Sequence, residues 1–141
     1  MTDVSAETTI PAVPYSLLVR VAPSDERWDE LVHVVETETE HGFVANVLPV
    51  EAPGMSVDEL IDAVRRSGPW SRCVFVADER TLSAPDLPVL VVDGMRREAS
   101  FRCAADSLFA VDANLNSGNL AWQYFHEKLG PDGVHRDRYW A

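Results

Sequence analysis

The chain has 141 residues, of which 46% are hydrophobic and 25% are charged. This length and composition are those of one globular domain with its own core, and they exclude a disordered or collagen-like chain. The formal net charge of −11 repels nucleic-acid phosphates and anionic lipids, so we expect neither nucleic-acid nor membrane binding. The charge favours a basic protein partner, and a small-molecule ligand also stays open.

Cysteine and histidine spacing indicates neither a disulfide framework nor a metal site. Cys73 and Cys103 lie in two separate apolar segments, so we expect both to be buried thiols. The four histidines are scattered and none has a second ligand at metal-binding spacing. We therefore expect no metal and no cofactor. The first residues lack the basic region of a signal peptide, which predicts a cytoplasmic protein.

Residues 1–14 are polar and contain Pro11 and Pro14, which predicts a flexible tail in front of a single domain over residues 15–141. The apolar, β-forming residues 15–21 predict the first strand, and Pro23 ends it.

The next segment predicts a helix that begins at Ser24 and continues through the acidic residues to Glu40. Trp28, Leu31 and Val35 recur at helical spacing and predict a buried stripe. Gly42 is placed to end this helix, and residues 43–50 predict the second strand.

Ser56 and Glu59 have the spacing of a capping box, in which each side chain accepts a hydrogen bond from the other residue's backbone amide. A second helix is therefore predicted from residue 57 to residue 66. Short apolar segments at 72–77, 89–92 and 99–103 predict three more strands, and the direction of the last one, parallel or antiparallel, stays open.

This order of elements predicts the α/β class, with a mostly parallel or mixed sheet of 4–5 strands flanked by helices. Residues 106–130 predict helices at the carboxyl end, with a break over residues 114–119.

Two carboxylates follow predicted strands, and they are the candidate catalytic groups. Asp78 and Asp93 would lie where ligands bind in open α/β sheets, and they could act as acid and base. The alternative is that each caps a turn, as Asp commonly does.

The segment from residue 114 to residue 126 is the candidate binding site, because amide and aromatic side chains gather in it. Such groups line pockets and recognition surfaces, although Asn also caps helix breaks. The candidate binding residues are Asn114, Asn116, Asn119, Trp122, Tyr124 and His126.

The chain resembles a family of small actinobacterial proteins known as a domain of unknown function. The resemblance rests on FVADERTL, LPVLVVD, ANLNSGNLAWQYF and the terminal PDGVHR, and it spans about residues 15–136. Ala121 and Trp122 stand where the family has an acid and a phenylalanine. The resemblance implies a bacterial, cytoplasmic protein and assigns no activity.

Two functions remain open. The first is a non-catalytic accessory protein, for example an immunity-type module, that presents acidic helices to a basic partner. The alternative is a small enzyme of specialised metabolism, with Asp78 or Asp93 as acid or base and a pocket beside Asn114 and Asn119.

Overall fold

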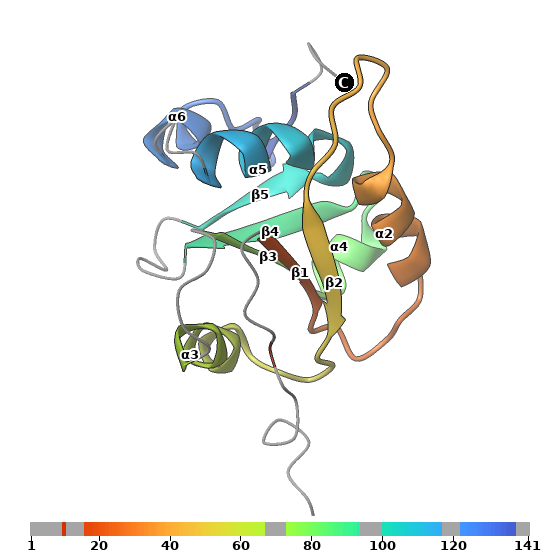
Figure 1. Cartoon of the computed structure of the whole chain (residues 1–141), viewed down its shortest axis with the longest axis vertical. Coiled ribbons are helices and arrows are strands. Elements are labelled where there is room, and N and C mark those ends of the chain that lie inside the picture. The colour runs from red at the N-terminus through yellow and green to blue at the C-terminus, as the bar shows by residue number, and fades with distance from the viewer. Residues whose placement is uncertain (1–9, 11–15, 67–72, 94–99, 117–121, 138–141) are drawn as a thin grey trace, which may run out of the picture.

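In a computed structural model of the protein, the described residues are 10, 16–66, 73–93, 100–116 and 122–137. They form one mixed sheet with helices on both faces, which confirms the α/β class (Figure 1). The sheet has six strands in these residues, in the order β2-β1-β3-β4-β5-β6, rather than the four or five expected. The additional strand β6 (Val134–His135) is too short to produce a recognisable hydrophobic period.

The amino-terminal half of the sheet is parallel. Strand β1 (Ser16–Arg20) lies between β2 (Val47–Glu51) and β3 (Cys73–Ala77). All residues of β1 and β3 are buried, as expected for strands that are covered on both faces. The chain moves in one direction across the sheet from β1 to β2 and in the other direction from β2 to β3. Because both crossovers are right-handed, the helices that follow β1 and β2 lie on opposite faces of the sheet.

The carboxyl-terminal half turns antiparallel. Strand β4 (Pro88–Asp93) pairs antiparallel with β3, and β5 (Phe101–Ala104) pairs antiparallel with β4. The direction of β5 relative to β4, which the sequence left open, is therefore antiparallel, while β6 lies parallel to β5.

Helix α3 (Val57–Arg66) begins as the capping box predicts. The Glu59 amide donates to Ser56 Oγ over 3.1 Å, and the Ser56 amide donates to Glu59 Oε1 over 3.0 Å. Two orphan amides are thereby satisfied.

Helix α2 (Trp28–Glu36) is shorter than the predicted helix from Ser24 to Glu40. Ser24 Oγ accepts from the Glu26 amide in a turn that precedes the helix. At the other end, the Thr37 hydroxyl donates to the His33 carbonyl. This bond competes with the backbone hydrogen bond that would extend the helix. Most of the acidic segment therefore lies in the loop between α2 and β2, and β2 begins later than predicted.

The remaining helices are short. Helix α4 (Glu79–Ser83) lies between the predicted strands 72–77 and 89–92, where no helix was predicted. A 3-10 turn at Ala105–Ser107 leads into α5 (Leu108–Asn116), and α6 (Trp122–His126) follows. Two helices therefore flank the predicted break, part of which lies outside the described residues. None of the helices in the described ranges is long and apolar enough to span a lipid bilayer.

Helices α2, α5 and α6 cover one face of the sheet and α3 covers the other (Figure 1). Alternate residues of β1 belong to the two hydrophobic cores on opposite faces of the sheet. Leu18 packs under α2 and α5, while Leu17 and Val19 pack against α3.

Asp112 joins α5 to the edge of the sheet. Its side chain is only 8% exposed. Oδ1 accepts from Ser16 Oγ over 2.6 Å, and Oδ2 accepts from the Asn46 amide over 2.8 Å. Because these donors precede or begin β1 and β2, a single carboxylate connects three segments that are distant in the sequence.

We expect Asp112→Ala to lower the free energy of unfolding by about 2–3 kcal/mol, because two buried donors lose a charged acceptor. Asp112→Asn should cost less, since the amide oxygen can still accept from Asn46 and its NH₂ can donate to Ser16. Urea unfolding of both variants measures the difference, with the exposed Asp62→Ala of α3 as control. Equal stability of Asp112→Ala and wild type would contradict a role for this carboxylate in holding α5.

Candidate functional site

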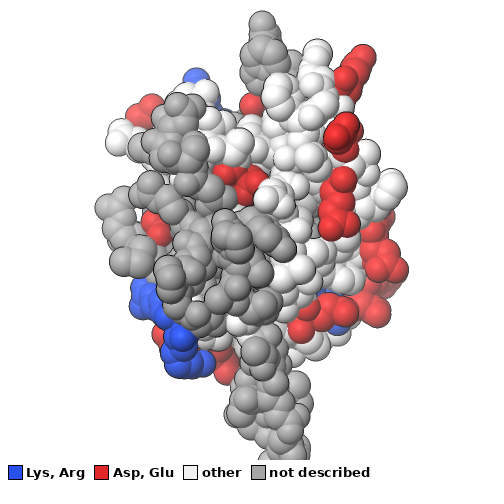
Figure 2. Space-filling view, in the orientation of Figure 1, with Lys and Arg blue, Asp and Glu red and all other residues white. Residues whose placement is uncertain are grey.

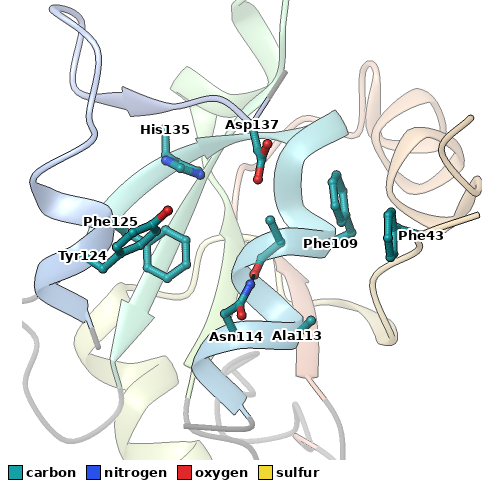
Figure 3. A pocket seen from close by; sticks show the side chains of 9 residues that line it. Phe43, Phe109, Ala113, Asn114, Tyr124, Phe125, His135 and Asp137 are labelled. Atoms are coloured by element: carbon teal, nitrogen blue, oxygen red, sulfur yellow. Dashed lines mark hydrogen bonds between the residues drawn. The ribbon is translucent and has the colours of Figure 1, made fainter. Parts of the chain in front are cut away.

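An aromatic cleft of about 330 Å³ lies on the α5 side of the sheet. Four segments line it: the loop before β2, helix α5, helix α6 and the chain around β6 (Figure 3). Its volume is that of a small-molecule site. The lining residues are Phe43, Phe109, Ala110, Ala113, Asn114, Tyr124, Phe125, His135 and Asp137.

Aromatic rings form the two long walls of the cleft. On one side Phe43 stacks on Phe109, with ring centroids 5.6 Å apart and planes 9° apart. On the other side the ring of Tyr124 meets Phe125 edge-on at 5.3 Å, and Phe125 is held from behind by stacking on Phe101. Both walls are thus fixed by neighbouring rings, so the cleft exists without a ligand.

His135 closes one end of the cleft. Its side chain is only 5% exposed, and its ring meets Phe125 edge-on at 5.1 Å. Neither ring nitrogen has a hydrogen-bond partner in the described part of the chain. Burial lowers the pKa of His135; the charge of Asp137 opposes this shift and that of Lys128 adds to it. The ring is therefore neutral at pH 7, with one unsatisfied donor and one unsatisfied acceptor.

Two further polar groups border the same space. The Asn114 amide nitrogen donates to the Ala110 carbonyl over 2.7 Å, which fixes the orientation of that side chain on α5. The backbone amide of Asp137 donates to Ser107 Oγ over 2.8 Å. Figure 3 shows the side chains of His135 and Asp137 turned toward one end of the cleft, with Asn114 at the other end.

The two candidate catalytic carboxylates lie outside this cleft and far from each other in the sheet. In the register of β3 and β4, Asp93 stands opposite Cys73, at the start of β3, whereas Asp78 follows the end of β3. The two side chains were expected near one edge because the ends of parallel strands meet there. Since β3 and β4 are antiparallel, their carboxyl ends lie at opposite edges.

The Asp78 carboxylate has a structural role. It caps α4 by accepting from the Thr81 amide over 3.1 Å. Arg102 donates to both its oxygens, over 3.0 and 2.6 Å. Burial alone would raise the pKa of Asp78, but the bonds from Arg102 and Thr81 outweigh it and lower the pKa. Asp93 is buried at the end of β4.

The candidate binding segment divides between the cleft and the core. Asn114 and Tyr124 line the cleft. Trp122 is buried and meets the Phe101 ring edge-on at 5.7 Å, which is a packing role. His126 also contacts Phe101, outside the cleft lining. Asn116 ends α5, but its side chain and all of Asn119 lie outside the described residues.

Sequence reasoning identified Asn114 and Tyr124 and missed the other cleft residues, among them Phe43, Phe109, His135 and Asp137. Phe43 was assigned to a strand, and Phe109 to the helical segment before the predicted break. The one sequence feature that could have indicated His135 is the PDGVHR segment, which contains it and is part of the family resemblance. Nothing local indicated that this segment packs against α5.

Cys73 and Cys103 are buried thiols, as predicted. Burial, with the charges of Asp106 and Asp137, raises the pKa of Cys103 well above its ordinary value, so it is a poor nucleophile. The described residues contain no cluster of three or more metal-binding side chains.

Comparison with known proteins identifies the family. The sequence model of a domain of unknown function, DUF6924, matches residues 15–138. A search of curated proteins finds no match. The match covers most of the chain, so the chain belongs to the DUF6924 family.

We expect His135 to make the protein less stable as the pH falls below about 6.5, its unperturbed pKa. The unfolded chain then binds a proton that the folded chain resists, so the free energy of unfolding decreases. Urea unfolding between pH 7.5 and pH 5, in roughly half-unit steps, should show a smaller decrease in His135→Gln. Val134→Ala, a core change without titration, should keep the wild-type slope. Parallel pH profiles of wild type and His135→Gln would contradict the prediction.

Proposed function

Because membership of this family assigns no activity, we propose from the geometry that the chain is a non-catalytic accessory module that binds a basic protein partner. The observation that supports this most is the loop between α2 and β2. Phe43 and Val44 in this loop are 45% and 44% exposed, the most exposed large hydrophobic side chains of the described residues. A cytoplasmic, actinobacterial setting belongs to the same proposal.

Acidic side chains surround these two residues in the sequence and on the surface. Glu36, Glu38 and Glu40 precede them and are exposed. Figure 2 shows acidic side chains along the side of the molecule formed by α2 and this loop, next to uncharged surface. We call Phe43, Val44 and the three glutamates the loop surface.

An apolar centre with a charged rim is the arrangement of many protein interfaces. Burial of the centre stabilises the complex, while the rim steers a partner of opposite charge. Phe43 is already stacked on Phe109, so binding would cost little additional side-chain entropy. These features favour a partner that carries an apolar surface among lysines and arginines.

The second candidate function is the small enzyme. It is favoured by a concave aromatic cleft that contains Asn114 and Tyr124. The expected acid or base, Asp78 or Asp93, does not line this cleft. An enzyme that used the cleft would depend on His135 as base instead, although no carboxylate of the described residues is hydrogen-bonded to its ring.

Affinity capture from a lysate of the native host tests the proposed module. The double variant Glu38→Gln, Glu40→Gln and the single variant Val44→Ser should each retain much less of a specific partner than wild type. The control double variant Asp62→Asn, Glu127→Gln removes the same number of charges elsewhere and should retain it fully. Raising the salt from about 50 to about 500 mM should also weaken capture by wild type.

The measured association rate should fall about tenfold in the glutamate variant, because steering acts mainly on association. Two results would contradict the proposal: capture that is indifferent to salt, or equal losses in the two double variants. An enzyme without a protein partner would capture nothing specific in any of these experiments.

A further inference from the structure

The aromatic cleft contains a buried imidazole whose hydrogen bonds are not made by the described chain. Both nitrogens of His135 lack a partner there, although the side chain is 95% shielded from solvent. An unpaired buried polar atom costs about 1–3 kcal/mol. A cavity opens beside this ring, so a polar group of a ligand in the cavity would form the missing hydrogen bond and remove this cost.

The charged group that lines the cleft is negative. Asp137 supplies a carboxylate, and among the described residues no lysine or arginine lines the cleft, although Lys128 stands over Tyr124 at its rim. Because burial lowers the pKa of His135, the imidazole adds a neutral acceptor rather than a positive charge. The net charge of −11 adds a negative field over the whole molecule. An anionic ligand would therefore be disfavoured at this site.

The aromatic walls of the cleft also favour a cation. The faces of aromatic rings carry negative electrostatic potential and attract ammonium groups. The protein uses this interaction at the rim, where Lys128 Nζ lies 5.1 Å from the centre of the Tyr124 ring. Within the cleft, Phe109 and the more exposed Tyr124 supply aromatic surface on opposite sides (Figure 3).

We propose that this cleft binds a small organic ammonium ion that carries an aromatic ring. The ring lies between Phe109 and Tyr124, and the ammonium group donates hydrogen bonds to the Asp137 carboxylate and to the accepting nitrogen of His135. No covalent step is involved. The site shares Phe43 with the loop surface and otherwise uses different side chains, and the variants that test it leave Phe43 unchanged.

Three probes of nearly equal shape test the charge preference by isothermal titration calorimetry at pH 7. They are 2-phenylethylammonium, the neutral 2-phenylethanol and the anionic 3-phenylpropionate. We expect the ammonium ion to bind about tenfold more tightly than the alcohol, and the carboxylate to bind least tightly of the three. Equal affinity for the ammonium ion and the alcohol would overturn the proposal, and so would absence of ammonium binding at millimolar concentration.

Two variants distinguish the effect of the Asp137 carboxylate on ligand binding from the effect of the overall negative charge. Asp137→Asn keeps the backbone bond to Ser107 and should weaken ammonium binding about tenfold while leaving alcohol binding unchanged. Glu127→Gln removes one charge outside the cleft lining and should alter neither. An equal loss in both variants would mean that only the overall field acts, which would overturn the assigned site.

His135→Phe tests the second contact and needs a folding control. The circular dichroism spectra of His135→Phe and of the smaller change His135→Ala are compared with wild type first, and the affinity is measured in whichever of them is folded. That variant should bind the ammonium ion about tenfold less tightly than wild type, whereas His135→Gln, which retains a donor and an acceptor, should lose much less. Unchanged affinity in the folded variant would overturn the role of His135. None of these variants should change partner capture by the loop surface, so the two proposals fail separately.

Discussion

The position of α5 depends on the buried Asp112 carboxylate. A buried charge is tolerated only where hydrogen bonds replace its hydration, and Asp112 obtains two from donors beside β1 and β2, Ser16 Oγ and the Asn46 amide. These bonds fix one side of α5 against the edge of the sheet. Other residues of the same helix, Phe109 and Asn114, form a wall of the cleft. The shape of the cleft therefore depends on a polar contact outside its lining as well as on the packing of α5 in the core.

The same contact also organises the loop between α2 and β2. Asn46 is held by Asp112 at the end of the loop, and Phe43 stacks on Phe109 a few residues earlier. Both anchors are on α5. The loop surface and the cleft thus share one supporting helix and meet at the ring of Phe43. Partner binding and ligand binding are separate proposals, but both require α5 to stay where Asp112 holds it.

The sequence predicted those features that local chemistry determines. The Ser56–Glu59 capping box starts a helix because both partners lie within one turn. Apolar segments gave the strands, yet they carry no information on direction, so the antiparallel pairing of β4 separated Asp78 from Asp93 unexpectedly. Likewise, the amide and aromatic pattern located Asn114 and Tyr124 near a pocket.

The rest of the site depends on contacts between distant segments. Phe43 and His135 lie in distant parts of the sequence, and each looks ordinary in its own segment. The imidazole is buried without a hydrogen-bond partner among the described residues because it packs against Phe125, which no local pattern encodes. Distant packing, rather than any motif, creates the candidate site.

The most direct test observes the His135 imidazole while a ligand binds. Long-range ¹H–¹⁵N correlation spectra of the histidine rings are recorded during titration with 2-phenylethylammonium at pH 7. If the unsatisfied ring marks the binding site, the nitrogen signals of His135 shift saturably with the calorimetric affinity, while those of the exposed His33 do not. Saturable binding with unchanged His135 signals would contradict this account.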